Sequence, residues 1–279
     1  MNRSIRCLVA YIIVSAVLLL LSSRGDAQGE KSEWKPIVPK EVYQELVKRE
    51  IKQLEELFKD KLEVPQIRRA KFGAVLLAAL TLSVKDGVPA EELEGLRQAA
   101  LSLAVTLQDK TAVDDAKKLA AKLANAKPDP NFKLKVTWNN ILLKKGELMD
   151  PFSVKDKKGD GLHPDLQSDI RLKGALNGIE EKIHALAMKE LAATAMKKEA
   201  WELELLGYRS AVVAAIAYHL APPTKADAKD PQEWRKLSVE MRDQSISLAE
   251  AAKKGDGAGV FKASGALNSA CSQCHTLFR

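Results

Sequence analysis

The last nine residues of the chain, Cys271 to Arg279, read Cys-Ser-Gln-Cys-His-Thr-Leu-Phe-Arg. Cys271, Cys274 and His275 form the pattern C-x-x-C-H, which is the attachment signature of a c-type haem. Two cysteines three residues apart on a helix lie on one face, so both sulfur atoms can add to the vinyl groups of one porphyrin. The adjacent His275 is then placed to ligate the iron. We therefore predict one covalent haem c with its iron at this motif.

The alternative interpretations of the motif are a strained disulfide and half of a zinc site. A tetrahedral zinc site needs further Cys or His ligands nearby. The sequence has no such residue after the motif or closely before it. The remaining cysteine, Cys7, lies in the leader described next, so Cys271 and Cys274 are the only cysteines of the mature chain that we expect.

Residues 1–27 have the pattern of a secretory signal peptide. Arg3 and Arg6 form a basic start, an uncharged apolar run covers 8–21, and a polar segment ends at the small residue Ala27. A retained membrane anchor is the alternative, although the apolar run is shorter than the ~20 residues that a spanning helix needs. We predict a periplasmic or otherwise exported location, because bacteria attach haem to such motifs outside the cytoplasm.

The charge of the chain is basic but mixed. The formal net charge is +7, and because Arg3, Arg6, Arg24 and Asp26 together carry +2, about +5 remains for the mature chain. No basic stripe with interleaved aromatic residues occurs, so the composition argues against nucleic-acid binding. A basic surface is suited to steering an acidic redox partner.

The first half of the mature chain has a helical period. Pro65, Gly87, Pro89 and Pro128 separate apolar stripes that repeat every three or four residues. They predict four short helices with short loops, over about 41–62, 66–84, 89–107 and 111–126. This pattern is typical of an up-down bundle, and we assign it to residues 34–127.

Residues 128–162 predict a linker between two domains. They contain a short strand-like alternation, 132–138, and two turns rich in Lys and Gly. The segment 156–161 resembles a calcium loop, but Gln167 stands where such a loop needs Glu. We therefore predict no calcium site there.

The helical period returns in residues 163–279. It predicts helices over about 163–186, 192–220, 231–253 and 260–278, and the haem motif lies near the end of the last one. The predicted fold class is thus all-α: a four-helix bundle carrying the C-terminal motif, preceded by a second, haemless helical bundle. Phe72 with 78–80 matches Tyr208 with 214–216, which is consistent with an internal repeat.

The position of the motif in the chain distinguishes between two classes of c-type cytochrome. In a small class I cytochrome c the motif lies near the start of the domain and a Met ligand follows, whereas here only four residues follow His275. Residues 163–279 instead resemble the cytochrome c′ family, which typically ends C-x-x-C-H-x-x-[YF]-R. The resemblance implies covalent haem, ligation of the iron by His275, and Arg279 close to that histidine or to the haem edge, where its charge would help to set the potential.

The resemblance also concerns the sixth iron ligand. In the family the first helix of the bundle presents either Met or an apolar residue to the haem. The matching stretch here, 170–176, contains no Met, so Leu172 or Leu176 is expected to face the haem. This predicts a five-coordinate iron with a hydrophobic distal side that admits small gases and offers no hydrogen-bond donor.

Other His and Met residues have less specific interpretations. We interpret His163 as a cap or loop residue, His184 as a surface residue, and His219 as a residue at a helix C-terminus, where the dipole favours it. Met188 and Met196 lie at helical spacing and are expected to pack. Distal ligation by His163 or by either Met remains an alternative.

These features predict an exported c-type cytochrome that transfers single electrons, binds small gaseous ligands, or does both. The haem supplies the redox chemistry, and we predict no enzyme activity and no catalytic residue. A peroxidase needs distal acid and base groups, which the apolar stretch 170–176 does not supply. The alternative function is a haem-containing sensor or adaptor whose first bundle binds a partner. The expected partners are an acidic redox protein and, as a further possibility, a second copy of the chain.

Overall fold

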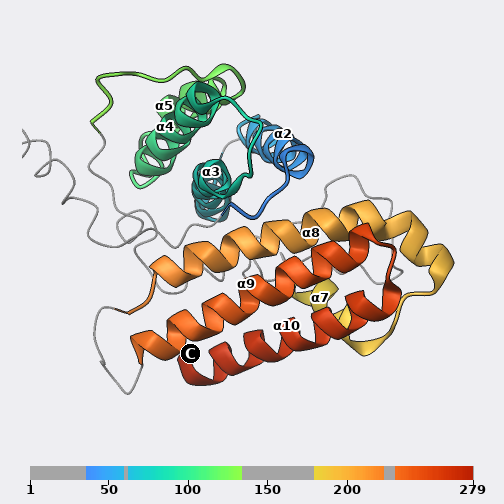
Figure 1. Ribbon diagram of the computed structural model, residues 1–279. Coiled ribbons are helices and arrows are strands. Elements are labelled where there is room, and N and C mark those ends of the chain that lie inside the picture. The colour runs from blue at the N-terminus through green and yellow to red at the C-terminus, as the bar shows by residue number, and fades with distance from the viewer. Residues whose placement is uncertain (1–35, 60–61, 134–178, 223–229, 279) are drawn as a thin grey trace, which may run out of the picture. The chain divides into compact units, whose positions relative to one another are not determined.

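The computed structural model describes residues 36–59, 62–133, 179–222 and 230–278 (Figure 1). Within these residues the regular structure is helical, apart from one isolated bridge between Val38 and Val84. The all-α prediction is therefore confirmed for this part of the chain. The helices are α2 (Lys40–Leu57), α3 (Val64–Ser83), α4 (Ala90–Thr106), α5 (Val113–Ala120), the 3-10 helix η1 (Leu123–Asn125), α7 (Ile179–Met188), α8 (Ala193–His219), α9 (Pro231–Lys253) and α10 (Gly257–Phe278).

The helices of the first half begin and end close to the residues that the sequence predicts. Glu63 caps α3 and exchanges hydrogen bonds with Gln66 in a capping box, while a proline occupies the first turn. Pro89 likewise precedes α4. The helix predicted to reach residue 126 is shorter, because α5 ends at Ala120 and a separate 3-10 turn follows.

The last three helices form an antiparallel succession. α9 packs against both α8 and α10, and α10 also packs against α7 (Figure 1). Asp230 accepts a hydrogen bond from the backbone N–H of Gln232 and so caps α9. Gly255, at φ 69°, forms the turn between α9 and α10, in a conformation that side chains with a Cβ rarely adopt. α10 begins at Gly257, one turn earlier than predicted.

A glycine sets the close approach of α8 to α9. A Cβ atom on Gly207 would lie 2.7 Å from both the backbone nitrogen of Ala249 and the carbonyl oxygen of Ser245. Because these neighbours are backbone atoms, a larger residue can fit only if the two helices move apart.

We expect Gly207→Ala to lower the free energy of unfolding by about 1–3 kcal/mol, the usual cost of overpacking a core. Chemical denaturation measures the change. Gly265→Ala is the matched control, because Gly265 is also helical but has no atom within 4 Å of its added Cβ. Both substitutions gain the same helix propensity, so their difference isolates the crowding. Equal stability of the two variants would contradict the close contact.

The described residues belong to one compact unit, within which α2 and α3 contact α8. The division into a bundle at 34–127, a linker at 128–162 and a haem domain at 163–279 stays a prediction, as does the internal repeat. The predicted signal peptide, residues 1–27, lies outside the described residues. Among the helices that the structure describes, none has both the length and the hydropathy of a membrane span.

Candidate cofactor site

The motif continues the buried stripe of α10. Residues three or four apart along this helix are almost fully covered, and they are Val260, Ala263, Ser264, Leu267 and Ala270. The next positions on the same face are Cys271 and Cys274. Cys271, Cys274 and the adjacent His275 are only half-buried. The helix thus directs both cysteines along its core-facing side, at the level where coverage by the other helices decreases.

The two cysteines carry thiols and form no disulfide. Burial raises the pKa of the Cys274 thiol above its ordinary value. Among the residues that the structure describes, no group of three or more His, Cys, Asp and Glu could hold a metal ion.

Met241 on α9 is a candidate that sequence reasoning missed. It lies in the middle of a stripe of buried residues, between Ser238 and Ser245, yet it is itself half-buried. α9 and α10 run in opposite directions from the turn at Gly255, and each residue advances 1.5 Å along a helix. Met241 is therefore about as far from the turn as Ala270. Met241 thus lies close to the level of the haem motif, whereas Leu237 and Ser238, further along α9, are buried again.

Three serines place hydroxyl groups in the core formed by α8, α9 and α10. Ser210 on α8, Ser245 on α9 and Ser264 on α10 are at most 5% exposed. Their hydroxyl oxygens have no hydrogen-bond partner among the described residues. Sequence reasoning expected an apolar distal side formed by Leu172 or Leu176 and did not single out these serines, whose hydroxyls can donate or accept hydrogen bonds.

The other predicted residues are scattered or lie outside the described part. Leu172, Leu176, His163 and Arg279 lie outside the described residues, so their predicted roles stay predictions.

The remaining His and Met residues can be placed. His184 is exposed on α7, with Nδ1 3.4 Å from Oδ1 of Asn268, and His219 is the last residue of α8, as predicted. Met196 packs at 1% exposure, whereas Met188 is 71% exposed, so the prediction that Met188 packs was wrong. Met188 is the last residue of α7, beyond the stretch that the neighbouring helices cover.

A helical bundle whose last helix presents C-x-x-C-H along its buried stripe is the architecture of a class of covalent haem proteins. Residues 184–279, from within α7 to the end of the chain, match the family model described as Cytochrome C'. The predicted family and the predicted part of the chain are thus confirmed. Proteins of this family bind covalent haem c with its iron, in agreement with the predicted cofactor. No curated protein matches the chain, and no solved structure matches it.

The described residues fit such a cofactor. The two thiols lie on one helix face, a histidine follows them directly, and all three side chains are only half-buried. Porphyrin attachment needs two adjacent thiols, and iron ligation needs an imidazole nitrogen. Both requirements are met within one turn and a half of α10.

Proposed function

We propose that the protein is an exported c-type cytochrome with one covalent haem, acting in one-electron transfer, in the binding of small gaseous ligands, or in both. The observation that supports it best is the C-x-x-C-H motif on the core-facing side of α10, inside the segment that matches the family model. The haem iron supplies one-electron redox chemistry and an axial coordination site. The chain supplies attachment, ligation and exclusion of water.

In this proposal Cys271 and Cys274 are the attachment residues. Each thiol adds its sulfur and its hydrogen across one vinyl double bond, which forms a thioether and needs no oxidant. His275 ligates the iron through an imidazole nitrogen. Arg279, as the family resemblance implies, contributes a positive charge near this histidine, which disfavours the more oxidised and more positive iron.

For the opposite side of the haem we propose Leu172 or Leu176, which leave the sixth position open to a small ligand. Apolar side chains there would exclude water and admit neutral gases.

A haem-containing sensor or adaptor whose first bundle binds a partner is the second candidate, and the composition of the first half supports it. Residues 34–127 contain no Cys and no His, so they can hold no haem of their own by these ligands. We propose no enzyme activity. The basic net charge fits an acidic redox partner, and a second copy of the chain is the alternative partner.

Reduced-minus-oxidised spectra of the purified full-length protein test the proposal. We expect a c-type band that persists after acid–acetone extraction, since thioether-bound haem stays with the protein. We also expect a high-spin spectrum that shifts when CO is added. Absence of the band would refute the main proposal, and a low-spin spectrum would show that a Met or His side chain occupies the sixth position.

A further inference from the structure

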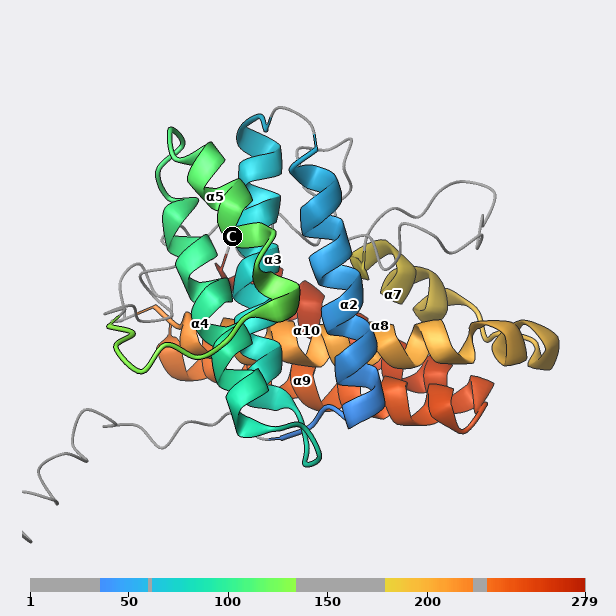
Figure 2. The ribbon, with the colours of Figure 1, turned by 90° about the horizontal axis from the view of Figure 1, so that it is seen from above.

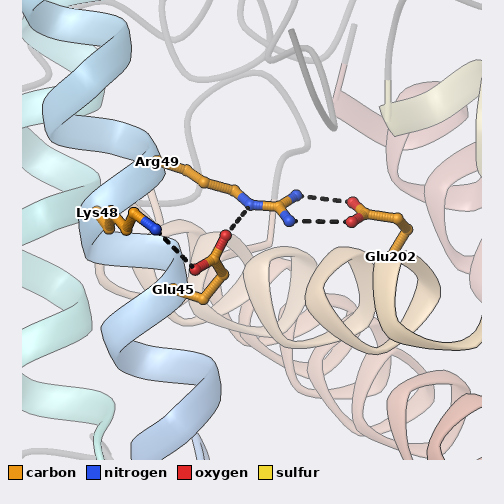
Figure 3. A network of polar contacts seen from close by, with 4 residues as sticks. All are labelled: Glu45, Lys48, Arg49 and Glu202. Carbon is orange, nitrogen blue, oxygen red and sulfur yellow. Dashed lines mark hydrogen bonds and ion pairs between the residues drawn. The ribbon is translucent and has the colours of Figure 1, made fainter. Parts of the chain in front are cut away.

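Arg49 on α2 makes a bidentate ion pair with Glu202 on α8 (Figure 3). Its Nη1 atom donates to Oε2 of Glu202 at 2.7 Å, and Nη2 donates to Oε1 at 2.9 Å. The remaining nitrogen, Nε, donates to Oε1 of Glu45 at 2.7 Å, and Nζ of Lys48 lies 3.9 Å from Oε2 of Glu45. Two parallel hydrogen bonds fix the orientation of the guanidinium as well as its charge.

The next residue of α2 makes a second ion pair with α8. In this pair the acid lies on α2 and the base on α8, which is the reverse of the Arg49–Glu202 pair. Glu50 accepts a hydrogen bond from Nη2 of Arg209 at 2.7 Å. The side chains of Arg209 and Glu50 are only 5% and 6% exposed. Gly73 on α3 leaves room for this carboxylate, because a Cβ at that position would lie 2.5 Å from Oε1 of Glu50.

The crossing of the two helices explains how neighbouring residues on α2 reach distant residues on α8. Figure 2 shows α2 running across α8. Arg49 and Glu50 point in different directions from α2, whereas Glu202 and Arg209 lie on one side of α8, about two turns apart. One side chain therefore reaches toward the start of α8 and the other toward its end.

The opposite polarity of the two pairs makes the arrangement specific. If α2 crossed α8 in the reverse direction, Arg49 would face Arg209 and Glu50 would face Glu202. Like charges in contact at a partly buried interface cost several kcal/mol, which selects against that orientation. The charges thus encode one orientation of the N-terminal helices.

We propose that the side of α8 defined by Glu202 and Arg209 is a docking surface for α2 of the same chain, and that the two Arg–Glu pairs hold the N-terminal helices on it in one orientation. The haemless N-terminal half is then the resident partner of the haem-bearing helices, and it covers this side of α8 against other proteins. The docking of α2 on α8 does not depend on haem attachment.

Amide hydrogen exchange of the full-length protein, with the cofactor bound, tests the docking. We expect Arg49→Glu to place two carboxylates opposite each other and to speed exchange in α2 about tenfold, with α9 and α10 unchanged. Adding Glu202→Arg to that variant restores the ion pair with its polarity reversed, and we expect protection of α2 to return to within about twofold of the original. If Arg49→Glu alone does not fold, recovery of folding in the double variant is the same test.

Lys118→Glu is the matched control, because it reverses the charge of a cation paired with Asp115 at the surface, where both side chains are more than 70% exposed. We expect α2 to exchange as in the unchanged protein. The proposal is overturned if Arg49→Glu leaves the exchange of α2 at the level of this control. It is also overturned if Glu202→Arg fails to restore protection in the double variant.

Discussion

Replacing both Cys271 and Cys274 with alanine is expected to remove all covalently bound haem from the purified protein. Both sulfurs lie on the core-facing side of α10, and they are the only cysteines among the described residues. No other thiol there can form a thioether. Acid–acetone extraction followed by a spectrum of the protein fraction measures the loss, which we expect to be complete.

The single variants sharpen this prediction. Cys271→Ala and Cys274→Ala each leave one thiol, so we expect covalent haem at lower yield, with a band shifted by the one unsaturated vinyl group. Ser272→Ala is the control within the motif, because the Ser272 hydroxyl is exposed and donates to the carbonyl oxygen of Asn268 at 3.0 Å. It should attach haem as the original protein does. A c-type band that survives extraction in the double variant would disprove attachment at these cysteines.

The sequence was sufficient to predict the helices because their boundaries depend on local signals. Prolines at positions 65, 89 and 231 lie at or just before the starts of helices, and Gly255 forms a turn that needs positive φ. These residues act through their own backbone geometry, so no tertiary information is needed. The 3-10 turn at Leu123–Asn125 escaped prediction because its sequence is compatible with a continuing helix.

The candidate site was predictable only in part, because some of its features are local in sequence and others depend on how the helices pack. The C-x-x-C-H motif is local, and the helix period alone places both cysteines on one face. Met241 could have been found from its spacing to Ser238 and Ser245, but its incomplete burial depends on how α9 and α10 pack. The burial of the Ser210, Ser245 and Ser264 hydroxyls without a hydrogen-bond partner also depends on helix packing.

The pairs that join α2 to α8 were beyond sequence reasoning altogether. Arg49 and Glu202 are 153 positions apart, and Glu50 and Arg209 are 159 apart. Before the fold is known, each of these residues looks like one of many charged residues on a helix surface. Only the crossing of the two helices shows that they are partners.

Arg209→Ala is expected to lower the free energy of unfolding by about 3–5 kcal/mol, because it leaves the Glu50 carboxylate buried without this cation. Arg49→Ala should cost much less, about 0–1 kcal/mol, since Arg49 and Glu202 are 22% and 25% exposed and water can replace the lost contact. Chemical denaturation of the cofactor-bound protein, followed by circular dichroism, gives both values. Equal losses in the two variants would show that the Glu50–Arg209 pair is solvated in solution.

Removing both charges of the buried pair separates the cost of an unpaired charge from the contribution of the pair itself. In the variant with Glu50→Leu and Arg209→Met, no charge is left uncompensated, and buried ion pairs replaced by apolar residues of similar volume are often neutral or more stable. We therefore expect this variant to recover most of the stability that Arg209→Ala loses. If it does, the Glu50–Arg209 pair mainly determines the orientation of α2 on α8 and adds little stability. This agrees with the reversed order of acid and base in the two ion pairs. If the double variant is as unstable as Arg209→Ala, packing around the guanidinium stabilises the interface and its charge does not.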